Sequence, residues 1–226
     1  MSLKTRFGNL GNILDFSKLT KDNIYVLNSP VLSNAQFERF IKFFGNNNKV
    51  LDCTFNKDED LESSINQLKL KAEQAVREGI KQIILSDKNI SENKMPMPML
   101  LCIGAINTHL VKLGLRGYVS INVQTGDALD THSFATLIGV GATTVNPYLA
   151  FDSLYQRHSK KLFGNFTFDE CVSRYVKSVN LGLLKIMSKM GISVLSSYRG
   201  GCNFETVGLS RTIVKDYFPG MLSKIS

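Results

Sequence analysis

Short, mostly apolar runs alternate with longer segments of helical periodicity from about residue 48 to the end of the chain. The runs are rich in Val, Ile and Leu, and the run 82–86 (QIILS) is nearly all apolar, which is typical of strands buried on both faces of a parallel sheet. Strands are therefore predicted at 49–55, 82–86, 117–123, 142–146 and 192–196, with one more near 24–27.

Between these runs, apolar residues recur at spacings of three and four, which predicts amphipathic helices. In the segment 60–79, for example, Leu61, Ile65 and Leu68 share one face, and Gly79 follows where a helix usually ends. Further helices are predicted at 34–44, 96–113, 131–137, from 149 onward, at 169–189, near 204 and at 212–217.

The resulting order is a strand followed by a helix, repeated five or six times. Such alternation predicts an α/β fold with a parallel sheet and right-handed crossovers, either doubly wound or curled toward a barrel. A complete eight-unit barrel typically needs about 250 residues, and this chain of 226 residues has too few units. We therefore expect a parallel βα-repeat sheet that forms an incomplete, TIM-barrel-like domain.

The composition narrows the functional classes. The formal net charge is +8, but the Lys and Arg residues are spread along the chain without the interleaved aromatic residues that a single-strand binder requires. No window approaches the roughly eighteen consecutive apolar residues that predict a membrane-spanning helix. We expect no nucleic-acid partner, no membrane association and a cytoplasmic location.

Cysteine and histidine are too scattered to predict a metal site. No CxxC pair occurs, whereas the common metal sites need closely spaced ligand pairs. This spacing predicts free, mostly buried thiols in a reducing compartment, at Cys53, Cys102, Cys171 and Cys202.

Polar residues stand at the ends of several predicted strands, where chemistry gathers in parallel α/β folds. For Asp52, Asp87 and Asn146, helix capping and turn formation are the favoured interpretation. The run 196–199 is a stronger candidate for a binding site, because two hydroxyl groups, a phenol and a guanidinium group precede Gly200. The candidate residues for a flavin phosphate or a dicarboxylate are Ser196, Ser197, Tyr198 and Arg199.

Several longer runs follow one another in an order that is specific to a family. The most distinctive is 134–151 (FATLIGVGATTVNPYLAF), and the others are NSPVLS at 28–33, ILSD at 84–87, MPMLLCIGA at 97–105, GLLKIMSKMGIS at 182–193 and SYRG at 197–200. Over about residues 25–226 the chain resembles the large subunit of glutamate synthases. Such long ordered agreement is far more specific than any single short motif.

The resemblance implies a role within a larger enzyme that makes glutamate from glutamine and 2-oxoglutarate. It implies an FMN cofactor, an iron–sulfur cluster, and an amidotransferase domain whose ammonia reaches the FMN domain through a tunnel. The amidotransferase and FMN domains of the same polypeptide would be the partners, with a small flavoprotein subunit or ferredoxin as the electron source. The resemblance does not identify the donor as NADPH, NADH or ferredoxin, nor the oligomeric state.

The resemblance also predicts the domain organisation: an N-terminal extension at 1–22, the central α/β domain at 23–180, and a linker helix with the first strand of the FMN domain at 181–226. Ser2 is not an N-terminal nucleophile, and the cysteines form no cluster. We therefore expect the chain alone to be non-catalytic and to bind no cofactor. At 196–199 the resemblance implies an edge of the FMN or substrate site.

The chain departs from the family pattern at four positions: Asn107, Ser133, Cys202 and Asn203. Two alternative functions stay open at this point. One is a free-standing βα-repeat enzyme that binds a phosphorylated ligand, and the other is a basic nucleic-acid-binding module.

Overall fold

A four-stranded parallel sheet forms the centre of the computed structural model, which describes residues 1–8, 14 and 24–225. Its strands lie side by side in chain order: β3 (Asn48–Asp52), β5 (Gln82–Ser86), β7 (Ser120–Gln124) and β8 (Thr144–Asn146). With right-handed crossovers, this sequential order places every connecting helix on the same face. The prediction of a parallel, barrel-like sheet is confirmed, and the doubly wound alternative is wrong.

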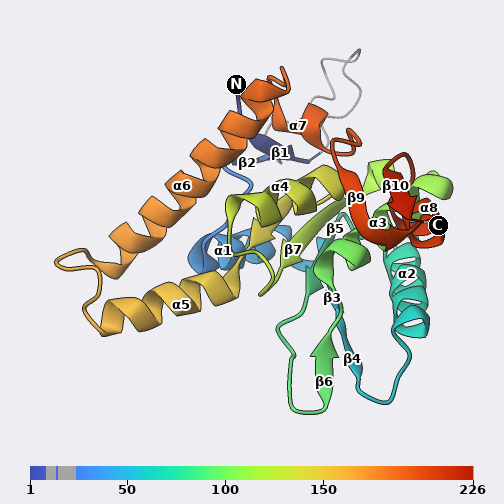
Figure 1. The fold of residues 1–226 in the computed structure, drawn as a ribbon, viewed down its shortest axis with the longest axis horizontal. Helices are drawn as coiled ribbons and strands as arrows, with labels where there is room; N and C mark the ends of the chain where they lie inside the picture. The colour runs from blue at the N-terminus through green and yellow to red at the C-terminus, as the bar shows by residue number, and fades with distance from the viewer. Residues whose placement is uncertain (9–13, 15–23, 226) are drawn as a thin grey trace.

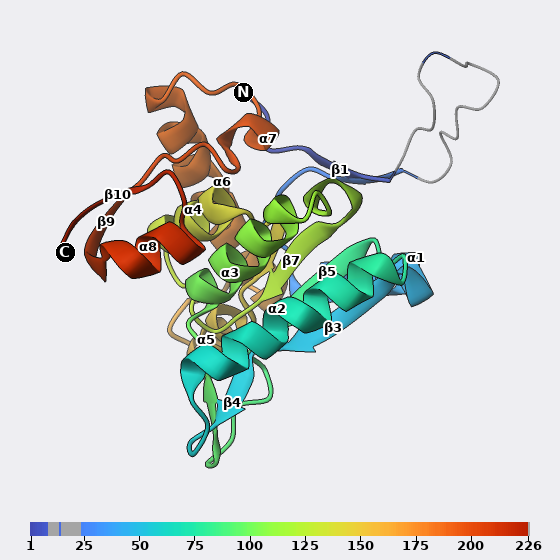
Figure 2. The same ribbon diagram turned by 90° about the vertical axis from the view of Figure 1, so that its right-hand side faces the viewer.

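The connecting helices cover the outer face of this sheet (Figures 1 and 2). They are α2 (Leu61–Arg77), α3 (Met99–Lys112) and α4 (Thr131–Val140). Alternate strand residues point toward them and form the main core, including Ile83, Leu85, Ile121, Val123 and Val145, all 0% exposed. The four-stranded sheet does not close in the described residues, although Val31 adds a parallel bridge to Val145 at the β8 edge.

The opposite, inner face is covered by α1 (Asn34–Phe44), which begins with a capping box formed by Ser33 and Gln36. Phe37, Phe40 and Phe44 of this helix pack in a second cluster with Ile84 of β5. The cluster also contains Phe7, whose ring lies 5.1 Å from that of Phe40 in an edge-to-face arrangement.

Much of the inner face is polar and satisfied by cross-strand hydrogen bonds. Asn122 donates to Gln82 Oε1 over 3.0 Å and accepts from Thr144 Oγ1 over 2.7 Å. One layer further along, Ser86 donates to Gln124 and Gln124 donates to Asn146. Because buried polar groups need partners, these rows tie the strands together in one register.

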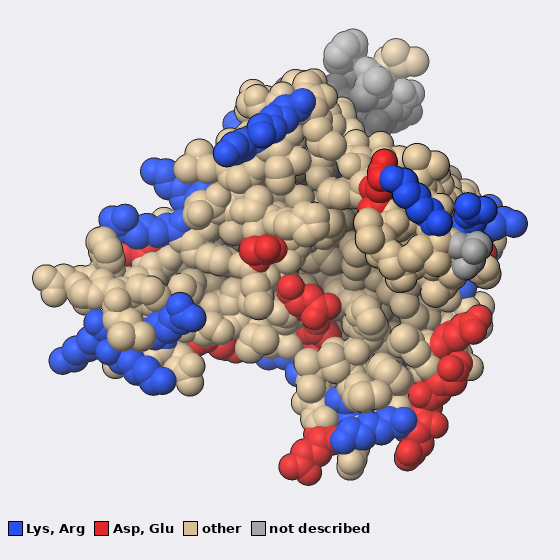
Figure 3. All heavy atoms as spheres, in the orientation of Figure 1, with Lys and Arg blue, Asp and Glu red and all other residues tan. Residues whose placement is uncertain are grey.

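The remaining elements surround this centre. Two helices, α5 (Tyr148–Ser159) and α6 (Phe168–Lys189), pack together into an arm that projects from the sheet in Figure 1. Basic residues gather on this arm in Figure 3, and Arg174, Lys177, Lys185 and Lys189 of α6 are exposed, as a solvated face predicts. The smaller elements are β1 (Thr5–Phe7), β2 (Tyr25–Leu27), η3 (Gly45–Asn47), β4 (Thr54–Asn56), β6 (Lys94–Pro96), η4 (Arg116–Tyr118), α7 (Leu195–Tyr198), β9 (Glu205–Ser210), α8 (Arg211–Tyr217) and β10 (Leu222–Ile225).

Three predicted elements need correction. The strand predicted at 192–196 is wrong, because 195–198 forms the helix α7, whose spacing of three buries both Leu195 and Tyr198 while Val194 stays exposed. The helix predicted near 204 is wrong, since 205–210 is strand β9 paired in parallel with β10. The predicted strand 49–55 is divided at Cys53 into β3 and β4, and β4 pairs with β6 instead of continuing the sheet.

The predicted domain boundaries stay predictions. Within the predicted extension 1–22, residues 9–13 and 15–22 lie outside the described residues. The predicted boundary at 180/181 falls inside α6, which continues without a break to Lys189.

Candidate functional site

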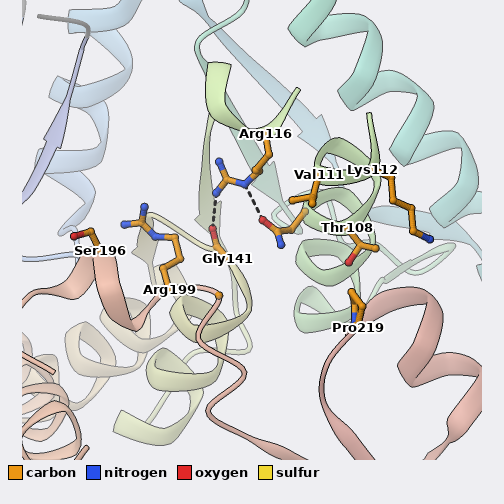
Figure 4. A pocket seen from close by; sticks show the side chains of 10 residues that line it. Thr108, Val111, Lys112, Arg116, Gly141, Ser196, Arg199 and Pro219 are labelled. Carbon is orange, nitrogen blue, oxygen red and sulfur yellow. Dashed lines mark hydrogen bonds between the residues drawn. The ribbon is translucent and has the colours of Figure 1, made fainter. Parts of the chain in front are cut away.

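A cavity of about 610 Å³ opens between α3, the segment that precedes β7, the end of α4, and α7 (Figure 4). It lies at the amino-terminal edge of the sheet, because Arg116 and Gly141 precede β7 and β8 respectively. Its lining residues are Asn107, Thr108, Val111, Lys112, Arg116, Gly141, Ser196, Arg199, Gly200 and Pro219. Three of these are basic and none is acidic.

Arg116 is anchored by three acceptors from separate segments. Its Nε donates to Asn107 Oδ1 over 2.7 Å, and its two terminal nitrogens donate to the carbonyl groups of Val119 and Gly141. Burial, and to a smaller extent the nearby positive charge of Arg199, lower the pKa of Arg116 to about 10. The guanidinium group is therefore rigidly held and poorly hydrated.

The geometry of Gly141 supports this anchor. Gly141 ends α4 with a φ of 148°, and a Cβ there would come within 2.9 Å of the Asn107 amide group. A side chain at this position would displace Asn107, which is the acceptor for Arg116 Nε. Glycine thus allows the close approach of α4 to α3 on which the position of Arg116 depends.

Arg199 follows α7 directly and lacks such anchors. Its Nε is buried and has no hydrogen-bond partner among the described residues. Burial also lowers the pKa of this guanidinium group. Its place is set by the backbone, since Gly200 N donates to Gly139 O over 2.8 Å and so ties the end of α7 to α4.

The structure divides the four residues predicted at 196–199. Ser196 and Arg199 line the cavity, whereas Ser197 is exposed outside it. Tyr198 is 1% exposed, packs in the main core, and has a hydroxyl group without a hydrogen-bond partner in the part of the chain described. Burial raises its pKa to about 12, so the phenol stays neutral.

The polar residues at the carboxyl ends of the strands bond within the chain, but only Asp52 makes the local turn that was predicted, whereas Asp87 and Asn146 bond to distant segments. Asp52 accepts hydrogen bonds from the backbone and hydroxyl of Thr54. Asp87 accepts from Thr125 Oγ1 and from the amide of Gly126. Asn146 donates to the carbonyl of Leu32 and to Asn34, which fixes the start of α1 against β8.

Comparison with known proteins identifies the family. Residues 1–210 match the family model described as the glutamate synthase central domain. The chain belongs to the glutamate synthase central domain family. It is 48% identical over 229 residues to the glutamate synthase [NADPH] large chain of Azospirillum brasilense, and 40% identical over 226 residues to that of Bacillus subtilis. It is also 37% identical over 241 residues to ferredoxin-dependent glutamate synthase 1 of Arabidopsis thaliana.

These relatives are much longer than this chain, which matches only a small part of each. The matches cover 99–100% of this chain but 15% of each of the three relatives. A solved structure of a flavocytochrome b2 variant, at 13% identity and a TM-score of 0.47, covers 88% of this chain and 47% of its own. The strand order itself, rather than this likeness, defines the fold.

The side chains present do not fit the iron–sulfur cluster that the resemblance implies for the whole enzyme. Cys53, Cys102 and Cys171 are buried and Cys202 is exposed. The pKa of the Cys53 thiol is raised by its hydrogen bond with Cys102 and by burial, which opposes the thiolate form that metals bind. Within 1–8, 14 and 24–225, no group of three or more His, Cys, Asp or Glu residues could hold a metal ion.

Arg116 was missed by the sequence interpretation. It follows a helix that ends near Gly114 and precedes a strand, a position where basic residues are usually solvated. Its acceptors come from residues up to 25 positions away, so nothing local signals its burial. A separate finding concerns membranes: no helix in the described residues is both long and apolar enough to cross one.

Proposed function

We propose that this chain serves as the central domain of a glutamate synthase large subunit, in an enzyme that makes glutamate from glutamine and 2-oxoglutarate. The match of residues 1–210 to the central domain family supports this most directly. The domain itself is non-catalytic in this proposal. It joins the amidotransferase and FMN domains of the same polypeptide and holds them at a fixed separation.

The packing of the chain suits such a connecting role. The sheet is packed on both faces, by α2, α3 and α4 on one side and by α1 on the other. The cross-strand rows around Asn122 and Gln124 fix the register of the strands. Buried, satisfied polar networks favour one rigid arrangement, which a domain that spaces two active sites requires.

The proposal includes the cofactors, electron source and location of the whole enzyme. FMN and the iron–sulfur cluster belong to other parts of the polypeptide, and the electrons come from a small flavoprotein subunit or from ferredoxin. The free cysteines of the described chain fit a reducing compartment such as the cytoplasm. Both NADPH-linked and ferredoxin-dependent enzymes are among the relatives, so the donor stays open.

A segment exchange tests the proposed function. The matching segment of the Azospirillum brasilense large chain is replaced by residues 1–226, and glutamate formation from glutamine and 2-oxoglutarate is measured with NADPH. We expect the exchange to retain glutamine-dependent synthesis, and a matched enzyme lacking the segment to lose it. A stable, flavin-containing exchange protein without glutamine-dependent synthesis would contradict the proposal.

We further propose that Ser196, Ser197, Tyr198 and Arg199 lie at the edge of the FMN or substrate site in the whole enzyme. Ser197 is exposed and the Arg199 side chain donates to no described residue, which supports contact with a group from outside this chain. The chain alone is expected to bind FMN weakly, since it supplies one edge of the site. Calorimetric titration of residues 1–226 with FMN checks this, and submicromolar binding would exclude it.

A further inference from the structure

The cavity concentrates positive charge without a counter-charge. Lys112, Arg116 and Arg199 line it, and no Asp or Glu does. Across the described ranges, no ion pair engages any of these three residues. Placing two guanidinium groups near each other in a poorly hydrated space is unfavourable unless an anion compensates them.

The two arginines differ in how many donors they have left. Each guanidinium nitrogen of Arg116 donates a hydrogen bond to a protein acceptor, and the three bonds fix the plane of the guanidinium group. The side chain of Arg199 donates to no described residue, and its Nε is nevertheless buried. Figure 4 shows the two guanidinium groups on the same side of the cavity, and their charges interact strongly enough to lower the pKa of Arg116.

From this arrangement we infer that the cavity binds a small organic molecule through an oxyanion group held between Arg116 and Arg199. Arg116 provides a preorganised positive field, and Arg199 provides the free donors that contact the oxyanion directly. Arginine suits this role because its planar fork matches carboxylate and phosphate oxygens.

The rest of the lining indicates the size and character of the ligand. Val111 and Pro219 supply apolar surface. The Thr108 hydroxyl already donates a hydrogen bond to Tyr217 O, which leaves the Thr108 methyl group for contact with a ligand. A volume of about 610 Å³ exceeds that of an inorganic ion and falls within the range of about 300–1,000 Å³ typical of small-molecule sites. The shared chemistry is therefore an oxyanion on a short organic body, with a carboxylate or a phosphate as the anionic group.

Titration of residues 1–226 with succinate and with glycerol 3-phosphate, at constant ionic strength, tests the inference and separates the two anionic groups. We expect one of them to bind with saturation by calorimetry and to raise the melting temperature. The substitution Arg199→Gln should weaken that binding at least tenfold, and Arg199→Lys should weaken it by less, because charge remains but the fork is lost.

Arg174→Gln provides the matched control. Arg174 lies on α6 over the ring of Phe166, away from the cavity, and its loss should leave binding unchanged. In the absence of ligand, Arg199→Gln should unfold at the same or a higher temperature than the original chain, since it removes an uncompensated, partly buried charge. A lower melting temperature would indicate a structural arginine and contradict the inference.

Two further outcomes would overturn it. One is the absence of saturable binding of either compound at millimolar concentrations. In that case the group that compensates the cavity would be an acidic side chain from another protein surface. The other is an equal loss of binding in Arg199→Gln and Arg174→Gln, which would indicate non-specific screening of charge. Because Arg199 also belongs to the proposed edge of the FMN or substrate site, the inference deepens that proposal. These assays measure neither FMN binding nor glutamate synthesis, so their failure is distinguishable from a failure of the segment exchange.

Discussion

The hydrogen-bonded row around Asn122 gives the sharpest test of how the sheet is held together. Asn122 is 0% exposed, donates to Gln82 Oε1 and accepts from Thr144 Oγ1. Asn122→Ala removes both interactions, together with a longer bond of 3.4 Å to the Ile83 carbonyl, and leaves the side-chain oxygens of Gln82 and Thr144 without these partners. An unsatisfied buried polar group costs about 1–3 kcal/mol, so we expect the free energy of unfolding to fall by about 3 kcal/mol in total.

Urea denaturation and thermal unfolding measure this effect. For a chain of this size, 1 kcal/mol corresponds to about 2–4 °C in melting temperature, which predicts a decrease of about 6–12 °C. Asn165→Ala is the control, because Asn165 is exposed and makes no hydrogen bond to the described residues; such surface changes stay within about 0.5 kcal/mol. A loss no larger than that of the control would refute the view that the row stabilises the inner face.

Three further predictions concern packing, titration and helix capping, each measured by denaturation. Gly182→Ala should destabilise by about 1–3 kcal/mol, because its Cβ would lie 2.4 Å from Thr131 Cγ2, and Thr131→Ala in the same chain should restore much of the loss. Burial raises the pKa of Asp87 in the folded state above its ordinary value of 3.8, so the original chain should lose stability relative to Asp87→Asn as the pH rises above 3.8; a pH-independent difference would contradict this. Ser33→Ala removes one half of the α1 capping box and should cost about 1 kcal/mol, whereas Ser33→Asp should cost little.

The parallel sheet could be predicted from sequence because its signals are local. Gln82–Ser86 is apolar almost throughout, and the structure buries all five residues. The helix α2 follows its predicted stripe, and Gly79, with a φ of 91°, stands just beyond its end as expected. In both cases the residues that decide the structure lie within a few positions of one another.

The C-terminal elements could not be predicted, because non-local pairing decides them. Strand β9 is defined by its partner β10, with Leu222 opposite Glu205 and the whole of α8 between them. Val207 within β9 is 92% exposed, so no buried alternation identifies the strand. The run 192–196 has the composition of a strand, but burial of Leu195 and Tyr198 against the main core favours a helical turn.

The position of the cavity explains why the sequence pointed to only part of it. Residues with chemical potential were sought at the carboxyl ends of strands, where sites in βα folds usually form. In this chain the polar side chains at that edge already bond within the protein. Ser86 donates to Gln124, Gln124 donates to Asn146, and Asn146 donates to Asn34 at the start of α1.

Arg116 and Arg199, both partly buried, lie at the opposite, amino-terminal edge, between helix ends that only the folded chain brings together. In βα folds that edge generally contributes stability rather than chemistry, which agrees with the proposal of a connecting, non-catalytic domain. The phenylalanines of α1 strengthen this argument, because they cover the face of the sheet that would form the interior of a closed barrel. The inner face is filled and the carboxyl edge is internally bonded, whereas Arg199, which lines the helix-lined cavity, keeps a buried Nε donor without a partner among the described residues.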